Sequence, residues 1–482
     1  MQVLQPGSYA VERRQTLPRM NIRANQPPLQ RQMREVASSN RALGDQPLTL
    51  VAGAARFPHA ALILSLAIAC NTILTAGLPT RTRYGAEAGR IAASIAEGNG
   101  FSSPFAQLAT GPSAWIPPAY PYLLAGIFRI FGVFSLASYW AAIGFNIIVH
   151  AVCCVLLYKV AGRVFGRLVG CCSAYALATF PLLFYPLVLL HFMPANAVVG
   201  ARGLFILPNN IWYNYLTELV ILVLILYTLD SPHWSIYGIA WGAGMLTNPG
   251  LLVLAPAFGA HVLTQRQRKS RQYLGLAVCV AGLCTLPWLT RNYLVFHRLI
   301  PIRDNFGVQL KVGNQPGEKG LWKHEVFPDS SLSELNRLAE LGEAEYDAEA
   351  RKEALQIIHA HPSEFVGNTI RRVGYWWFGI PVPSERLGNL RFLKNLPLSA
   401  FSALAFYGVV CAWRSRNRGA FLFVVVLLFY PMVYYVTHTY SLGYMYPIHP
   451  EMLALAAFAL VGEKAATSPL MLTTGLPGQT PT

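Results

Sequence analysis

Apolar segments recur along this sequence, and each is about as long as a helix that crosses a lipid bilayer. The hydrocarbon core of a bilayer is about 30 Å thick, so a crossing helix takes about 20 apolar residues. Eight stretches fit this length: residues 59–78, 136–158, 169–190, 210–229, 273–294, 395–413, 420–437 and 446–462. Lipid offers the backbone no hydrogen-bond partner, so these stretches have to be helical. The sequence therefore predicts an all-α polytopic membrane protein.

A ninth apolar stretch, residues 235–263, is interrupted by TNPG at 247–250. It is too long for one crossing and too short for two full crossings, and Asn-Pro-Gly is typical of a turn. We interpret the stretch as a short helical hairpin, which predicts a bundle of about ten spans.

The composition supports a membrane protein and argues against a nucleic-acid partner. Only 12% of the 482 residues are charged, against about 25% in soluble proteins. The formal charge of +16 comes largely from basic residues in short loops, at 159–167, 266–271 and 414–418. These loops share one side of the membrane if the N-terminus is cytoplasmic, as the positive-inside rule requires. We therefore predict a multi-pass membrane protein with both termini cytoplasmic.

Polar segments divide the chain further. Residues 295–394 carry 13 of the 22 acids and are predicted to form an outward polar domain with an interfacial helix. The eight cysteines fall in apolar stretches, and no zinc-ligand spacing occurs, so no disulfide framework, metal or other cofactor is predicted. The predicted domains are a disordered basic tail at 1–56, an N-terminal transmembrane region at 57–294 with an outward loop at 79–135, the domain at 295–394, a C-terminal transmembrane region at 395–463 and a flexible tail at 464–482.

The outward loop at 79–135 holds a polar stripe suited to chemistry. Spacings of 4, 3, 4 and 3 residues separate its members, which are Arg83, Glu87, Arg90, Ser94 and Glu97. This spacing predicts one face of an amphipathic helix. A solvated face with Arg–Glu pairs, each worth a few tenths of a kcal/mol, has the same pattern, so spacing alone leaves the role open.

GPSAWIPPAYP, at residues 111–121, follows the stripe. Its prolines cannot continue a helix, and Trp115 and Tyr120 are residue types that settle at a membrane–water boundary. The stretch is therefore predicted to be a pinned interfacial loop.

Several segments in order carry a resemblance to a known superfamily: EAGRIAASIAEGNGFSSPF (87–105), TGPSAWIPPAYPYLLAGIFRIFG (110–132), TNPG (247–250), PWLTRN (287–292), IPIRDNFGVQLKVGN (300–314) and YMYPIHP (444–450). Together they resemble the GT-C superfamily of membrane glycosyltransferases, in particular the bacterial relatives of protein O-mannosyltransferases and aminoarabinose transferases. The resemblance implies a polyprenyl-phosphate-linked sugar as donor and transfer, with inversion, to a lipid, glycan or protein acceptor on the periplasmic face of a bacterial inner membrane.

The resemblance also implies roles for individual residues. Glu87 corresponds to the acidic residue that acts as base on the acceptor, an Asp in mannosyltransferases, with Glu97 as the alternative. A short helix along the membrane is expected at about 118–131. Candidate substrate contacts are Arg83, Arg90, Trp115, Tyr120, Glu218, Arg291, Tyr444 and His449.

Two of these contacts have equally simple structural roles. Glu218 lies inside an apolar stretch and either orients substrate or pairs for helix packing. Arg291 ends an apolar stretch and either binds the donor phosphate or anchors the helix at the membrane surface. Rival functions are a flippase or transporter of lipid-linked sugars, which would favour internal repeats, and a polymerase or ligase of surface glycans.

Overall fold

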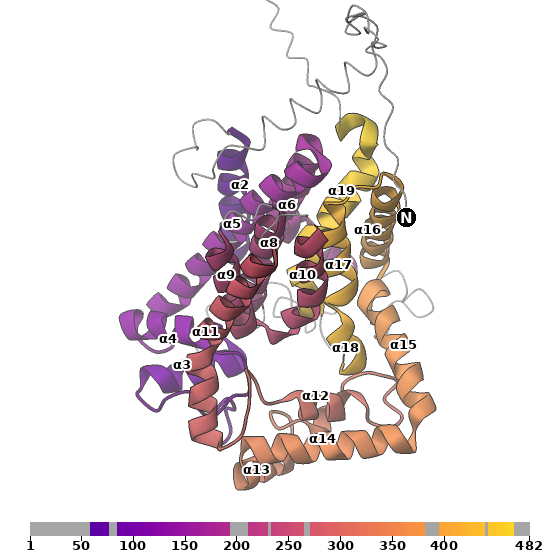
Figure 1. Ribbon diagram of the computed structural model, residues 1–482. Helices are drawn as coiled ribbons and strands as arrows, with labels where there is room; N and C mark the ends of the chain where they lie inside the picture. Colours follow the sequence, from indigo (N-terminus) through magenta and orange to yellow (C-terminus); the bar gives the residue numbers. More distant parts are fainter. Residues whose placement is uncertain are drawn as a thin grey trace, which may run out of the picture. The chain divides into compact units, whose positions relative to one another are not determined.

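The computed structural model describes residues 58–76, 84–192, 211–229, 233–264, 270–380, 395–438 and 442–466. These parts of the chain are built from helices (Figure 1), and their β-structure amounts to one isolated bridge between Ser102 and Pro112. The predicted disordered tail at 1–56 lies outside the described residues, and so does the predicted flexible tail at 464–482 except for residues 464–466, which belong to the last helix.

The predicted spans coincide with helices. They are α2 (Pro58–Ala76), α5 (Leu136–Phe165), α6 (Arg167–Phe192), α8 (Ile211–Leu229), α11 (Ser270–Phe296), α16 (Leu396–Arg414) and α19 (His449–Ala466). Residues 420–437 differ, because Pro431 divides the predicted span into α17 (Ala420–Phe429) and α18 (Met432–Val436). Within the described residues, three helices are long and apolar enough to cross a membrane: Leu136–Phe165, Arg271–Phe296 and Leu396–Arg414. The number of spans stays a prediction.

Helix α5 lies at the centre of the bundle and contacts α2, α6, α8 and α19. Small residues allow the helices to approach closely. A Cβ atom on Gly408 of α16 would lie 2.1 Å from the carbonyl oxygen of Leu455 on α19, so glycine is required at this crossing. The core consists of the apolar side chains that these helices turn toward one another.

The apolar stretch at 235–263 breaks where the sequence predicts a turn. Helix α9 (Trp234–Thr247) ends before Asn248, and a 3-10 segment, Pro249–Leu254, leads into α10 (Ala255–Thr264). The Asn248 side chain accepts a hydrogen bond from the Gly250 amide at 3.0 Å and donates one to the Tyr430 hydroxyl at 3.1 Å. Asn248 therefore fixes the break and ties it to the end of α17.

The segments between the long helices form the remaining helices. They are α3 (Ala86–Ala96), α4 (Ala119–Phe131), α12 (Phe306–Gly313), α13 (Leu332–Leu341), α14 (Glu343–Ala360) and α15 (Pro362–Phe378), with a 3-10 segment at Leu442–Ile448. The expected helix along 118–131 is confirmed as α4. Gly342, with φ of 77°, separates α13 from α14.

Loops distant in sequence pack together around an apolar cluster. The rings of Phe105 and Trp115 contact each other, with centroids 5.1 Å apart. Both also contact Phe327, at 6.5 Å for Phe105 and 6.1 Å for Trp115. The Asp304 amide donates to the Ala114 carbonyl at 2.8 Å. The loop of residues 101–118 is thus held against residues 304–327, and a cavity lies between them.

Candidate active site

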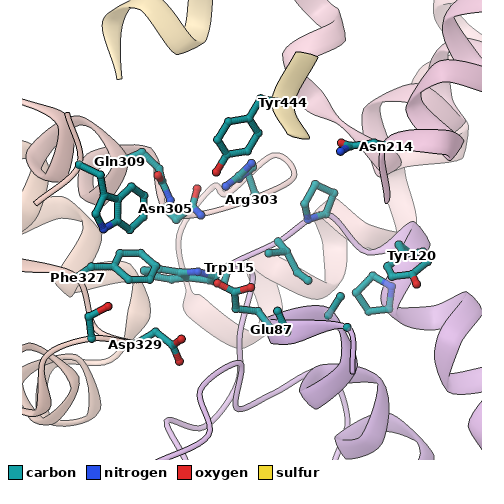
Figure 2. A pocket seen from close by; sticks show the side chains of 18 of the residues that line it. Glu87, Trp115, Tyr120, Asn214, Arg303, Asn305, Gln309, Phe327, Asp329 and Tyr444 are labelled. Atoms are coloured by element: carbon teal, nitrogen blue, oxygen red, sulfur yellow. The ribbon is translucent and has the colours of Figure 1, made fainter. Parts of the chain in front are cut away.

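A cavity of about 360 Å³ brings together α3, the loop before α4 and the segment around α12. Asn214 of α8 and Tyr444 also reach its wall. Figure 2 shows Glu87, Arg303 and Tyr444 along the middle of the cavity, with Gln309 and Asn305 on one side and Tyr120 and Asn214 on the other. Aromatic walls come from Trp115, Trp322 and Phe327.

Glu87 lies in the first turn of α3, where the helix dipole favours a negative charge. The helix begins after Gly85, whose φ of 87° is in the left-handed region. Burial raises the pKa of the Glu87 carboxyl, Asp329 raises it further, and Arg90 and Arg303 oppose the shift. A carboxylate that is more basic than usual and faces a cavity is suited to accept a proton from a hydroxyl group.

Glu343, in the first turn of α14, fixes the proline-rich loop of residues 111–121 through hydrogen bonds. The Ser113 hydroxyl donates to the Glu343 carboxyl group at 2.7 Å, and the Ala114 amide donates to its other oxygen. Burial raises the pKa of Glu343 to about 8. These contacts hold Trp115, which is 1% exposed, in the cavity wall. The sequence gives no signal for Glu343, because it is one of several acids in α14.

Arg303 lines the cavity and is its arginine, but it is not among the contacts that the sequence predicts. It lies within IPIRDNFGVQLKVGN, a stretch quoted for its resemblance without a role for the arginine. Its guanidinium group acts on the pKa of Glu87 and lines the same cavity. The neighbouring Asp304 has a pKa raised to about 7, first by burial and then by Asp347. Arg303 therefore supplies positive charge beside the candidate base.

The other residues missed are Asn214, Asn305, Gln309, His324 and Asp329, which all line the cavity. They come from parts of the chain far from Glu87, and only Tyr444 of the distant candidates was identified from the sequence. Asparagine and glutamine in apolar or helical stretches carry no pattern that separates a binding role from a packing role.

Arg90, a predicted substrate contact, lines a second cavity of about 630 Å³ and not the first, and the two cavities share Ala86 and Asp329. Its guanidinium lies 3.6 Å from the Asp329 carboxylate and donates to the Pro104 carbonyl at 2.9 Å. Glu97, the alternative base, lines the second cavity and not the first. Arg83 lies outside the described residues.

Three candidates lie away from the cavity wall. The carboxylate of Glu218 is 4.0 Å from the His150 ring between α8 and α5. Arg291 donates to the Ser113 and Phe101 carbonyls at 2.7 and 2.9 Å and stacks on Trp288, so it supports the loop behind the cavity. His449 contacts the rings of Phe180 and Tyr446.

The described part of the chain contains no group of three or more His, Cys, Asp or Glu side chains arranged to hold a metal ion. The charges available in the cavity are those of its own carboxylates and Arg303.

The chain combines helices long enough to cross a membrane with a cavity that holds Glu87, a carboxyl group with a raised pKa. These are features of an enzyme embedded in a membrane. The family model for dolichyl-phosphate-mannose-protein mannosyltransferases matches residues 116–290. This match confirms the resemblance to GT-C glycosyltransferases that the sequence motifs predict. No curated protein sequence matches the chain.

Among solved structures, the Archaeoglobus fulgidus oligosaccharyltransferase tethered with an acceptor peptide is similar, with a TM-score of 0.43 and 14% identity over 85% of this chain and 50% of that chain. ArnT from Cupriavidus metallidurans bound to undecaprenyl phosphate has a TM-score of 0.34 and 13% identity over 86% of this chain and 79% of that chain. The present chain thus spans about half the length of the oligosaccharyltransferase.

Proposed function

We propose that this protein is a membrane glycosyltransferase that moves a sugar from a polyprenyl-phosphate carrier to a hydroxyl group of an acceptor. The observation that carries the proposal is the placement of Glu87 and Arg303 in one cavity, with the pKa of Glu87 raised by burial. The matching family is named for a lipid-phosphate-linked mannose, which supports a donor of this class.

Glu87 and Arg303 are suited to the two partners of one displacement reaction, the attacking hydroxyl group and the leaving phosphate. Glu87 takes the proton of the acceptor hydroxyl as its oxygen attacks the anomeric carbon. The bond between that carbon and the phosphate oxygen breaks, and its electron pair leaves with the polyprenyl phosphate. The Arg303 guanidinium stabilises the phosphate as its charge increases. Attack from the side opposite to the leaving phosphate inverts the configuration of the sugar.

Aromatic side chains complete the site. Trp322 offers a ring against which the apolar face of a sugar can pack, with Trp115 behind it in the cavity wall. Tyr120, Tyr444 and Asn214 line the same cavity with polar groups. The acceptor, whether lipid, glycan or protein, enters beside Glu87.

The decisive experiment follows the carrier lipid. Purified protein in proteoliposomes is given undecaprenyl-phosphate sugars carrying a radiolabelled sugar, together with a cell-envelope extract as the acceptor. The expected result is release of free undecaprenyl phosphate in step with transfer of label to an acceptor. Movement of intact lipid-linked sugar across the bilayer without cleavage would establish a flippase instead. Activity with diphosphate-linked oligosaccharides alone would establish a polymerase or ligase.

We further propose that the cavity faces the periplasm. Single cysteines replace Gln107, Ser330 and Arg416, three exposed residues, in a background without the native cysteines. An impermeant thiol reagent added to intact spheroplasts is expected to label the first two and not the third, because the basic loop with Arg416 belongs on the cytoplasmic side. The reverse pattern would place the cavity in the cytoplasm.

A further inference from the structure

One wall of the cavity is formed by neutral amide side chains on α12. Asn305 precedes the helix and Gln309 lies one turn further along, and both line the cavity beside Arg303 (Figure 2). An amide group presents a carbonyl acceptor on one side and an NH₂ donor on the other. Which of the two faces the cavity determines what the wall can bind.

The answer for Gln309 comes from His438, which lies behind it. The Nε2 atom of His438 is hydrogen-bonded to the Oε1 atom of Gln309. His438 is 3% exposed, and burial, with Arg372 and Arg303 nearby, lowers its pKa to about 3. The ring is therefore neutral at physiological pH and carries a single N–H group.

The tautomer follows from the other ring nitrogen. Nδ1 of His438 is buried without a hydrogen-bond partner among the described residues. A buried N–H donor left unpaired is less tolerable than an unpaired acceptor. The proton therefore lies on Nε2, which donates to the Gln309 carbonyl and leaves the Gln309 NH₂ group for the cavity.

The position of His438 is itself fixed by a buried arginine. Arg372, which is 0% exposed, donates to the carbonyls of Tyr435 and Val436 at 3.1 Å each and to the carbonyl of Gly313. A Cβ atom on Gly313 would lie 1.7 Å from the Thr437 carbonyl oxygen, so the backbone before His438 lies directly on α12. Gly313 and Arg372 together hold the histidine against Gln309.

We propose that Gln309, oriented by His438, is a binding residue that donates a hydrogen bond to an oxygen atom of the lipid-linked sugar in the cavity. The inference rests on the proposed function, because that function supplies the ligand. The recognised oxygen belongs either to the phosphate or to the sugar, and both accept a hydrogen bond from a neutral amide. His438 is a positioning residue, since it acts through Gln309.

Gln309→Met tests the donor, because it keeps the length of the side chain and adds no charge but removes the NH₂ group. Equilibrium binding of radiolabelled undecaprenyl phosphate, with and without a sugar, to the purified protein in detergent measures the affinity. The expected result is affinity weakened by about tenfold or more. Loss with both lipids assigns the contact to the phosphate, and loss with the glycosylated lipid alone assigns it to the sugar.

Gln315→Met is the matched control, because Gln315 follows α12 and donates to the Lys311 carbonyl at 3.0 Å without lining the cavity. It should bind both lipids like the wild type. Unchanged affinity in Gln309→Met, or an equal loss in both variants, overturns the proposal.

The role of His438 is tested by two replacements. His438→Gln keeps a hydrogen-bond donor near the place of Nε2, whereas His438→Leu fills the space without a donor. The expected result is a raised donor KM with little change in kcat for His438→Leu, and recovery of KM in His438→Gln. Equal KM values in the two variants would show that the donor does not matter. Failure of the proposed function is recognised separately, because wild-type protein would then release no undecaprenyl phosphate.

Discussion

The cavity beside α3 and the interior of the bundle between α5 and α8 each enclose a carboxylate, but they surround it differently. Glu87 faces a cavity of about 360 Å³ together with Arg303 and is within the influence of Arg90 and Asp329. Glu218 is 2% exposed, lies 4.0 Å from His150 and does not line that cavity. The first environment leaves room for a reacting molecule, and the second fills the space around the carboxylate with packed helices.

The comparison separates two acids that the sequence makes candidates for different reasons. Glu87 lies on a polar stripe and matches the base of the resembling superfamily, whereas Glu218 lies inside an apolar stretch, where a carboxylate is costly. The structure places Glu87 at a cavity and buries Glu218 beside His150, and we therefore propose catalysis for the first and a packing role for the second. Variants of the two residues and of their neighbours test whether access to the cavity decides function.

Replacing the candidate base should have the largest effect. Glu87→Gln keeps the size of the side chain but removes the proton acceptor, so we expect turnover to fall by at least ~10²-fold with donor binding retained. Sugar transfer by the purified variant measures this, with thermal unfolding in detergent to confirm folding. Glu97→Gln is the matched control and should be mild, because Glu97 lines the other cavity. Near-normal turnover of Glu87→Gln would remove Glu87 from the mechanism.

Removal of the cavity cation should weaken use of the donor. Arg303→Gln loses a charge-assisted hydrogen bond worth roughly 1.5–3 kcal/mol. We therefore expect kcat/KM for the donor to fall by about tenfold or more, mainly through a higher KM. Arg298→Gln is the control, because Arg298 lies in the same segment but pairs with Glu345 at the surface. Equal kinetics of the two variants would argue against a phosphate contact at Arg303.

The pH dependence of turnover should report the environment of Glu87. The base acts only when deprotonated, so the rate falls as pH drops through its pKa, which burial raises above that of an ordinary glutamate. Because Arg303 lowers this pKa and Asp329 raises it, Arg303→Gln should move the midpoint of the acid limb to higher pH and Asp329→Asn to lower pH. Shifts in the same direction, or none, would show that another group controls the profile.

Glu218→Gln should have the smallest effect on chemistry. Since Glu218 does not line the cavity, we expect turnover and donor KM to stay within about threefold of wild type, with any change seen in thermal stability instead. The variant is assayed beside Glu87→Gln. A loss as large as that of Glu87→Gln would break the comparison and restore a substrate role for Glu218.

The sequence predicted most of the fold because a bilayer constrains helices strongly. Runs of apolar residues marked the long helices, Asn248 and Pro249 marked the break after α9, and the prolines at 117–118 marked the start of α4. Pro431 shows the limit: it lies in an apolar run that reads as one span, yet it divides α17 from α18. Hydropathy sums over a window and does not register one missing backbone hydrogen bond.

The candidate site was predicted only in part. Glu87, Trp115, Tyr120 and Tyr444 were chosen from the sequence and meet in the cavity, whereas Arg291 and His449 do not line it. Arg291 could not be placed by pattern, because an arginine at a helix end can bind a ligand or, as here, two carbonyl groups of a neighbouring loop.

The sequence by itself determined that the chain forms apolar helices and that a polar stripe follows the first of them, because both depend on local composition and period. Only the tertiary structure decided which polar groups share a cavity. His438 is hydrogen-bonded to Gln309 across 129 positions of the chain, because Gly313 of α12 lies against Thr437 after α18. Arg303 shares a cavity with Glu87 because its segment is held on the loop after α3, where the Asp304 amide donates to the Ala114 carbonyl. Such contacts depend on the paths of several helices at once, and no local pattern encodes them.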